Sequence, residues 1–257
     1  MTAPCLPDPF SLLAYDRLGS TNDEAKHLAQ AGAASWTLVW ARQQSAGRGR
    51  RQRVWESPQG NLYLSLILRP LADASSAAQL SFVAALAVGE ALAGRLPAGA
   101  ELRYKWPNDV LVDGRKIGGI LLESAASASG RVEWLVIGLG VNIGSHPAEA
   151  AYPAISLAAL AESGMSFEND GTLIGMVEDI GVAFRDWEAR WRQDGFEPVR
   201  QAWLGAAQGK GGMVEIKLDR ESFTGRFVDL DRDGALLVET EKGQRRVLAG
   251  DVFPVAA

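Results

Sequence analysis

Residues 45–61, SAGRGRRQRVWESPQGN, contain four arginines and two glycines within seven consecutive positions. These are Gly47, Arg48, Gly49, Arg50, Arg51 and Arg53. The chain as a whole is acidic, with 26 Lys and Arg against 31 Asp and Glu, so this arginine loop (45–61) stands out. Guanidinium groups bind phosphates and carboxylates through forked hydrogen bonds, so the loop suits such a ligand. A solvated arginine cluster or a docking patch would have the same composition.

Two glycine-rich phosphate-binding motifs do not fit the arginine loop. The dinucleotide fingerprint requires a third glycine where this sequence has Gln52, and a βαβ unit that does not follow. The P-loop pattern is absent as well. The function of the arginine loop must therefore be inferred from its positive charge and not from a known glycine-rich motif.

A second stretch, YKWPNDVLVDGRKIGGILLE (104–123), predicts a β-hairpin, because Asp-Gly at 113–114 between apolar runs favours a two-residue turn. In that register Leu111 faces Lys116 and Asp109 faces Gly118, which makes Asp109 and Lys116 diagonal neighbours on one face. Two more polar side chains, Lys105 and Asn108, stand at the mouth of the first strand. The set resembles the floor of a ligand site. An edge hairpin with an ordinary Lys–Asp pair is the alternative.

A third stretch, VIGLGVNIG, places Gly138, Gly140 and Asn142 on one face of a predicted strand. Glycine weakens a strand, so two on one face indicate the close approach of a ligand or of another backbone. Asn142 offers a donor and an acceptor beside that space. A β-bulge or tight packing explains the glycines equally well.

The elements that must position these residues follow from the hydrophobic pattern. A short strand precedes a helix that has capping-box spacing from Thr21 to Glu24 and a stop at Gly32. Further strands are predicted at 36–43, at 61–70, on either side of residues 113–114 and at 131–143. Helices are predicted at 75–96 and 172–194, each with an apolar face directed to the core.

The composition changes near residue 205, where GAAQGKGG (205–212) reads as a linker. Four short alternating runs follow, MVEIKL, TGRFVDL, GALLVET and RRVLAGDVF, separated by turn residues. They predict a small β-barrel. We therefore expect two domains, 1–207 and 208–257.

The bulk composition excludes several classes of function. A net charge of -5 argues against broad nucleic-acid binding. Cys5 is the only cysteine, and His27 and His146 are the only histidines, so a disulfide, a His triad and a Cys- or His-rich metal site are not expected. No apolar run has the length of a membrane span and no signal-peptide order is present, which predicts a cytoplasmic protein that does not bind a membrane.

Taken together, the three stretches and the sequence Ser-Thr-Asn at 20–22 resemble the biotin protein ligases. That family has Ser-Thr-Asn, a glutamine before Gly-Arg-Gly-Arg, Lys-Trp-Pro-Asn-Asp, a lysine before small residues, and Gly-x-Gly-x-Asn. The matching positions, in the same order, are 20–22, Gln44 with 47–50, 105–109, 116–119 and 138–142. Five ordered matches are specific, whereas one Gly-Arg-Gly-Arg would be weak.

The resemblance implies an α+β fold, with a class II synthetase-like biotin/lipoate ligase catalytic domain built on a mixed sheet with flanking helices, then a small SH3-like β-barrel. It implies that ATP and biotin, with Mg²⁺, form biotinyl-5'-AMP. The biotinyl group then passes to a lysine of a biotin carboxyl carrier protein domain of a biotin-dependent carboxylase. The negative charge that this reaction crowds together explains an arginine loop in an acidic chain.

The same resemblance assigns roles to residues. Biotin binding falls to Ser20, Thr21, Asn22, Gln44, Gly47, Arg48, Lys116, Gly118, Gly119, Gly138 and Gly140. Nucleotide binding falls to Arg50, Arg53, Trp55, Lys105, Asn108 and Asn142. Catalysis falls to Lys116 beside the biotin carboxylate, to Arg50 closing the loop, and to Asp109, which orients Lys116, aids Mg²⁺ or meets the incoming lysine. No protein-held metal site is expected, because Mg²⁺ is usually carried by phosphates and water.

Two departures from the family pattern bear on these assignments. Many relatives have glycine where Gln52 stands. Some carry an N-terminal DNA-binding domain, whereas about fourteen residues precede Tyr15 here, so DNA binding is not expected. The oligomeric expectation is a monomer or weak homodimer. The alternatives are a lipoate-protein ligase or other acyl-adenylating ligase, and a non-enzymatic RNA- or protein-binding module.

Overall fold

The computed structural model describes residues 4–70, 72–127, 130–149, 152–161 and 170–255. Its centre is a seven-stranded mixed sheet with the order β1-β2-β3-β7-β6-β5-β4. The strands are β1 (Ser11–Tyr15), β2 (Thr37–Ala41), β3 (Leu62–Leu68), β4 (Leu102–Lys105), β5 (Asp109–Val112), β6 (Arg115–Ala126) and β7 (Val132–Val141). β1 and β2 are parallel, and the other neighbours are antiparallel.

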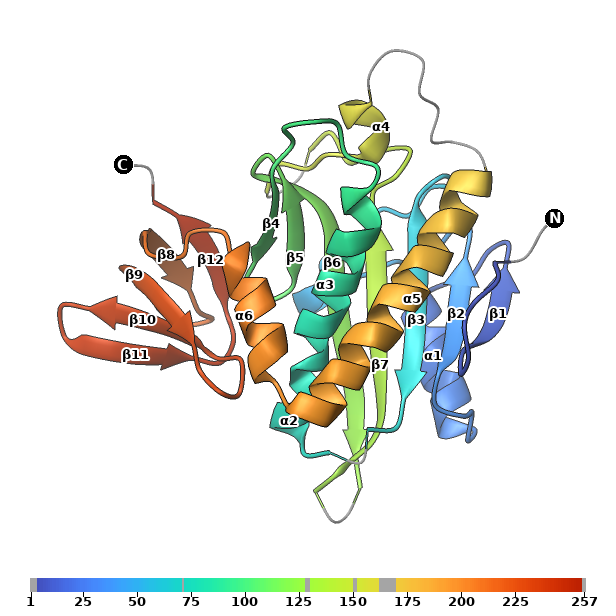
Figure 1. Ribbon diagram of the computed structural model, residues 1–257, viewed down its shortest axis with the longest axis horizontal. Helices are drawn as coiled ribbons and strands as arrows, with labels where there is room; N and C mark the ends of the chain where they lie inside the picture. Colours follow the sequence, from blue (N-terminus) through green and yellow to red (C-terminus); the bar gives the residue numbers. More distant parts are fainter. Residues whose placement is uncertain (1–3, 71, 128–129, 150–151, 162–169, 256–257) are drawn as a thin grey trace.

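The two faces of this sheet have different coverings. Helices α3 (Leu80–Ala93) and α5 (Asp170–Asp194) pack together over one face, whereas α1 (Thr21–Gln30) lies behind the sheet (Figure 1). Alternation along β7 sends Ile137 and Leu139 into the large core beneath α3 and α5. Gly138 and Gly140 therefore face the side of α1, which we call the α1 face. The α1 face carries the candidate site.

The predicted helix at 75–96 is divided in the structure. The chain breaks at Gln79 into α2 (Ala74–Ala78) and α3, and nearly every residue of α3 is buried. The expectation that no apolar run has the length of a membrane span is wrong for the stretch Ala74–Ala93, which has that length and composition. Most of this stretch is buried inside the protein, so α2 and α3 belong to the core of the fold.

Several local predictions need correction. The cap of α1 is Ser20, whose Oγ accepts from the Asp23 backbone N–H, and not Thr21. The hairpin is preceded by an unpredicted strand, β4, which pairs with β5. The structure also adds two unpredicted helices, α4 (Leu157–Leu160) and α6 (Glu197–Gly205). The apolar stripe of the 172–194 prediction is confirmed, with Trp187 among the buried residues of α5.

The chain ends in a five-stranded antiparallel sheet with the order β11-β10-β9-β8-β12, beyond α6 at the left of Figure 1. Its strands are β8 (Met213–Lys217), β9 (Ser222–Leu230), β10 (Leu236–Thr240), β11 (Gly243–Val247) and β12 (Asp251–Pro254). The run RRVLAGDVF was predicted as one strand but forms β11 and β12, with Gly250 at φ 156° between them. The predicted fold class, a mixed sheet with flanking helices followed by a small SH3-like β unit, is confirmed.

Candidate active site

A cavity of about 540 Å³ opens between the arginine loop, the α1 face and strand β12. Its wall contains every predicted site residue except Gly47 and Gly118. The predicted residues on the wall are Ser20, Thr21, Asn22, Gln44, Arg48, Arg50, Arg53, Trp55, Lys105, Asn108, Asp109, Lys116, Gly119, Gly138, Gly140 and Asn142. Segments more than one hundred residues apart in sequence therefore meet in one pocket.

Two lysines share one carboxylate at the hairpin. Lys116 Nζ lies 2.5 Å from Asp109 Oδ1, as the predicted face-sharing requires. Lys105 Nζ lies 3.5 Å from Asp109 Oδ2. The predicted facing of Asp109 and Gly118 is wrong, because a bulge between Val110 and Leu111 shifts the register so that Asp109 pairs with Gly119. The turn itself is as predicted, and Leu111 pairs with Lys116.

Lys105 is a cation taken out of water. Its side chain is 7% exposed and its ammonium group lies 4.8 Å from the ring centroid of Tyr152 and 5.1 Å from that of Phe253. Burial lowers the pKa of Lys105, although the charge of Asp109 opposes this shift. Since Phe253 belongs to β12, the C-terminal sheet helps to enclose this cation.

Three arginines of the loop contact the C-terminal sheet. Arg50 Nη1 lies 3.4 Å from Asn108 Oδ1 and 3.3 Å from Gly250 O, so these hydrogen bonds go to neutral oxygens. Burial lowers the pKa of Arg50. Arg53 Nη2 lies 2.5 Å from Asp251 Oδ2, and Arg51 Nη1 lies 3.3 Å from the same oxygen. Asp251 thus ties the loop to β12.

Three glycines of the sheet accept side chains that a methyl group would obstruct. A Cβ on Gly140 would lie 2.6 Å from Cε2 of Trp55, and one on Gly138 would collide with the amide of Asn22. A Cβ on Gly119 would meet the end of Lys116 at 3.2 Å. Gly138 and Gly140 share one face, as predicted, and the close approach that they permit is to side chains of this chain.

The two predicted residues outside the wall have other surroundings. A Cβ on Gly47 would lie 2.5 Å from Trp55 O, so this glycine permits the fold of the arginine loop itself. A Cβ on Gly118 would meet Gly140 O at 3.3 Å and Val110, on the face covered by helices. Neither glycine clears space in the cavity directly.

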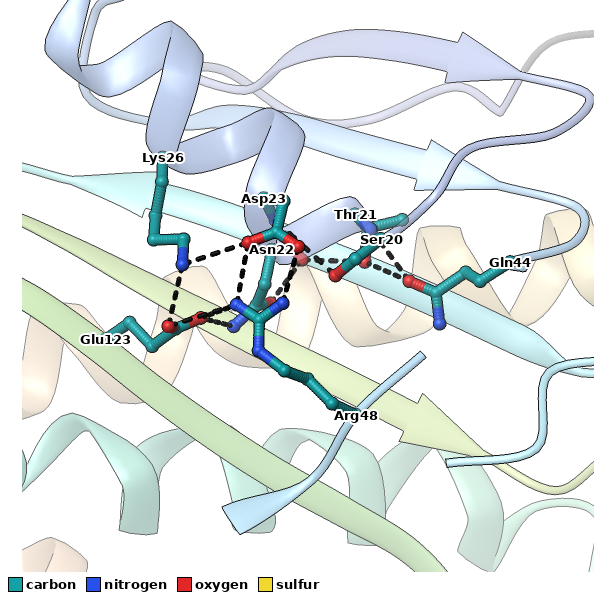
Figure 2. Close-up of polar contacts among 9 residues, drawn as sticks. Ser20, Thr21, Asn22, Asp23, Lys26, Gln44, Arg48 and Glu123 are labelled. Atoms are coloured by element: carbon teal, nitrogen blue, oxygen red, sulfur yellow. Dashed lines mark hydrogen bonds and ion pairs between the residues drawn. The ribbon is translucent and has the colours of Figure 1, made fainter. Parts of the chain in front are cut away.

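One end of the cavity is a polar network. Gln44 Oε1 accepts from Thr21 N at 2.7 Å and lies 3.1 Å from Thr21 Oγ1. The fully buried Ser65 places its hydroxyl 2.8 Å from Thr21 Oγ1 and 2.6 Å from Asn22 Oδ1. Figure 2 shows the contact between Thr21 and Gln44, with Ser20 beside it. Sequence reasoning missed Ser65, although a lone polar residue within the apolar run NLYLSLILRP is a recognisable signal.

Comparisons with known proteins match this chain over both sheets. Residues 14–142 match the model of the Biotin/lipoate A/B protein ligase family, and residues 211–253 match the Biotin protein ligase C terminal domain. The chain belongs to the biotin/lipoate A/B protein ligase family. It is 40% identical over 240 residues to a biotin–[acetyl-CoA-carboxylase] ligase of Paracoccus denitrificans, covering 92% of this chain and 98% of that protein.

Two further relatives span most of the chain. The bifunctional ligase/repressor BirA of Bacillus subtilis is 34% identical over 242 residues, which is 94% of this chain and 73% of that protein. The solved structure of a biotin protein ligase from Aquifex aeolicus in complex with biotin and ATP has a TM-score of 0.77 and 25% identity. The comparison covers 96% of this chain and 99% of that one.

The biotin/lipoate ligase pocket of this chain also contains a group of charges that the sequence did not predict. Arg48, assigned above to biotin, directs its guanidinium group to Asp23 and Glu123, and Lys26 bridges the same two carboxylates (Figure 2). The hydrogen bond from Arg48 is the largest cause of the lowered pKa of Asp23. Burial raises the pKa of Glu123, but hydrogen bonds from its partners outweigh burial and lower it.

Asn142 differs from its prediction in one respect. It follows the end of β7 and is 3% exposed, and its Nδ2 donates to Ile155 O at 3.1 Å. The side-chain amide therefore already has a partner within the protein. Its assignment to the nucleotide remains a prediction.

Proposed function

We propose a division of roles within this pocket for the ATP-dependent ligation of biotin to protein, the activity of the chain as a biotin protein ligase. One observation carries the proposal. Lys105 and Lys116 share the carboxylate of Asp109, and Arg50 lies beside the adjacent residue, Asn108, on the same cavity wall. Burial lowers the pKa of both Lys105 and Arg50, as is expected for cations in a site that binds an anionic ligand. A carboxylate and a triphosphate together supply such anions.

The first step joins the two substrates. A carboxylate oxygen of biotin attacks the α-phosphorus of ATP, the P–O bond to the β-phosphate breaks, and pyrophosphate leaves. Both reactants are anionic, so the step requires cations that are already in position. We assign Lys116 to the biotin carboxylate, with Asp109 orienting it through their 2.5 Å contact. We assign Arg50 and Lys105 to the phosphates, and Arg53, which pairs with Asp251 in this structure, to the same nucleotide side.

Mg²⁺ enters with ATP as part of the substrate. Among the described residues no group of three or more His, Cys, Asp or Glu side chains could hold a metal ion. We propose that the phosphates and water supply most ligands of this ion, as is usual for Mg²⁺. Its charge adds to that of the arginine loop in the first step.

The second step transfers the acyl group. The neutral amine of a lysine on the carboxyl carrier protein attacks the acyl carbon of biotinyl-5'-AMP. A C–N bond forms, the C–O bond to AMP breaks, and the amine loses a proton to water. We assign Arg50 to retaining the adenylate until the carrier arrives, because its guanidinium group spans the loop, Asn108 and Gly250. Trp55 covers the ligand, and its buried indole N–H has no acceptor among the described residues.

The polar end of the pocket favours biotin over lipoate. The cyclic urea of biotin offers N–H donors and a carbonyl acceptor, which match the hydroxyls of Ser20 and Thr21 and the amide of Gln44. A dithiolane ring would remove water from these groups without returning hydrogen bonds, which costs binding energy. Asn22 and Gly138 complete that end, and Asn108 and Asn142 stay assigned to the nucleotide side.

The organisation of the chain supports further parts of the proposal. The two sheets share no strand, so we divide the chain into a catalytic domain, 1–207, and an SH3-like domain, 208–257. With a net charge of -5 and its most apolar helix in the core, the protein is proposed to work in the cytoplasm without membrane or DNA. We propose that the protein is a monomer or a weak homodimer. Analytical ultracentrifugation measures this oligomeric state.

ATP–pyrophosphate exchange tests the activity and the acid together. The purified protein is assayed with Mg²⁺ and biotin, with lipoate, and with neither acid. Exchange with biotin alone is expected. Exchange with lipoate alone would overturn the interpretation of the polar end, and no exchange with either acid by folded protein would overturn adenylation.

A further inference from the structure

Four charged side chains of alternating sign join three segments at one edge of the pocket. Arg48 of the arginine loop contacts Asp23 of α1 at 2.5 and 2.8 Å and Glu123 of β6 at 2.9 and 3.1 Å. Lys26, one turn along α1, lies 2.9 Å from both carboxylates. We call these four residues the charge cluster (Figure 2). Two carboxylates and two cations balance, so the charge cluster has no excess charge with which to recruit an anionic substrate.

Glu123 has a second connection, into the polar end of the pocket. Its Oε2 accepts from Asn22 Nδ2 at 2.9 Å. The other end of that amide, Asn22 Oδ1, accepts from Ser65 Oγ at 2.6 Å and fills the space over Gly138. Because an amide has one donor end and one acceptor end, these two bonds fix which way Asn22 points. Glu123 therefore contacts both the arginine loop and the wall where the acid binds.

We propose that Glu123 is a positioning residue that anchors the arginine loop to the polar end of the pocket through Arg48 and Asn22. It does not itself line the cavity, so it acts through residues that do. Its effect on ligands rests on the function proposed above, whereas the anchoring of the loop does not. Arg48, in this view, holds the loop in place through its side chain and does not contact biotin with its guanidinium group.

The burial of the group makes such an anchor effective. The side chains of Arg48 and Glu123 are 17% and 26% exposed, so their bonds are less screened by water than those of a surface pair. The low pKa of Glu123 keeps its carboxylate charged at neutral pH. Charge-assisted bonds of this kind are stronger than bonds between neutral groups.

Limited trypsin digestion of the ligand-free protein tests the anchor directly. Trypsin cleaves after arginine, so the loop supplies its own sites at Arg50, Arg51 and Arg53, and mass spectrometry identifies these products. Glu123→Gln keeps the size and an acceptor for Asn22 but directs an uncharged amide at Arg48. We expect cleavage in the loop to be roughly fivefold faster, because partial burial puts the contribution of this pair near the upper end of the range measured for exposed ion pairs. Asp23→Asn, at a more exposed position, should have a smaller effect in the same direction.

Two comparisons separate anchoring from a general loss of structure. Glu221→Gln removes a carboxylate from an ion pair with Arg245 in the C-terminal sheet, and should leave loop cleavage unchanged. If Glu123 acts through Arg48, then adding Glu123→Gln to Arg48→Met should change cleavage less than twofold. Thermal unfolding of each variant shows whether the fold is intact, and Asp23→Asn still decides the question if Glu123→Gln does not fold.

The ligand readouts follow from the same variants. With Glu123→Gln, biotinyl-5'-AMP should leave roughly fivefold faster, and the defect in exchange should fall on the KM for biotin and not on kcat. Unchanged cleavage in both Glu123→Gln and Asp23→Asn would overturn the proposal. Faster cleavage with normal retention of the adenylate would overturn the link to the polar end. A wild-type protein without biotin-dependent exchange would refute the proposed function, while the digestion would still decide whether Glu123 anchors the loop.

Discussion

Replacing Gly140 with alanine probes the packing of the arginine loop on the central sheet. The new Cβ would lie 2.6 Å from Cε2 and 2.7 Å from Nε1 of Trp55. Real Cβ atoms do not approach other heavy atoms so closely, so the indole ring must move. The strand cannot yield, because β7 is hydrogen-bonded on both sides, to β3 and to β6. Trp55 stands on the loop, so the ring and the loop should lift together.

The size of the effect follows from the cost of overpacking. Inserting a methylene group into a packed site costs about 1–3 kcal/mol. A midpoint of about 2 kcal/mol corresponds to a roughly 30-fold change, since each 1.36 kcal/mol is tenfold. The clash destabilises the conformation in which Trp55 packs on the sheet. The sheet and the core are unchanged when the ring lifts away, so the free energy of unfolding should change little. We therefore expect adenylate retention and the kcat/KM for biotin to fall roughly 30-fold with little change in melting temperature.

The assay measures the release of biotinyl-5'-AMP and ATP–pyrophosphate exchange for Gly140→Ala beside a matched variant. Gly94→Ala is that control, because the new Cβ has nothing within 4 Å and the residue has ordinary helical backbone angles. Both measurements should be unchanged in the control. Kinetics within twofold of wild type for Gly140→Ala would refute the packing argument. So would a loss of activity that merely follows a loss of folded protein.

Four further predictions concern charges around the pocket. Arg50→Ala should speed release of the adenylate more than it weakens biotin binding, measured by dissociation and by titration; equal losses would contradict its role in closure. Lys116→Ala should slow adenylation roughly 100-fold, because it removes the cation beside the carboxylate, and a near-normal single-turnover rate would exclude that role. Asp251→Asn should loosen the loop from β12 and raise the KM for ATP a few-fold, within the range of an exposed ion pair. Folding lowers the pKa of the Glu123 carboxyl group, so the charged carboxylate stabilises the fold fully above its pKa in the unfolded chain. This stabilisation is lost as pH falls through its lower pKa in the folded protein. Below pH 4.5, the ordinary pKa, the melting temperature of the wild type should therefore fall more steeply than that of Glu123→Gln.

Much of the fold was predictable because its signals are local. Apolar runs bounded by turn residues gave most strands of the central sheet, and Asp-Gly at 113–114 gave the hairpin with its first pairs. The break at Gln79 carried no signal, since apolar residues continue across it. The bulge in the hairpin also escaped prediction, because register depends on how β6 fits between β5 and β7.

The site was predictable where its residues fall in ordered motifs, and missed where tertiary packing supplies them. Gly119 and Glu123 lie on the same face of β6, so the carboxylate that ends the run GGILLE could have been placed beside the glycines by alternation alone. Asp23 and Lys26 show only ordinary helix spacing. Asp251 and Phe253 come from the separate C-terminal sheet, and no local pattern indicates which face of that sheet meets the pocket.

The contacts of the arginine loop explain why an acidic chain concentrates arginines there. The four arginines do different work: Arg48 binds the carboxylates of α1 and β6, whereas Arg51 and Arg53 bind Asp251 of β12. Arg50, between them, has hydrogen bonds to neutral oxygens. Arg48, Arg51 and Arg53 pair with protein carboxylates on two sides of the cavity, whereas Arg50 lies on the cavity wall without a hydrogen-bonded carboxylate. The contacts on either side thus hold the Arg50 guanidinium group in position over the cavity, and stabilising an anionic transition state requires a cation positioned in this way.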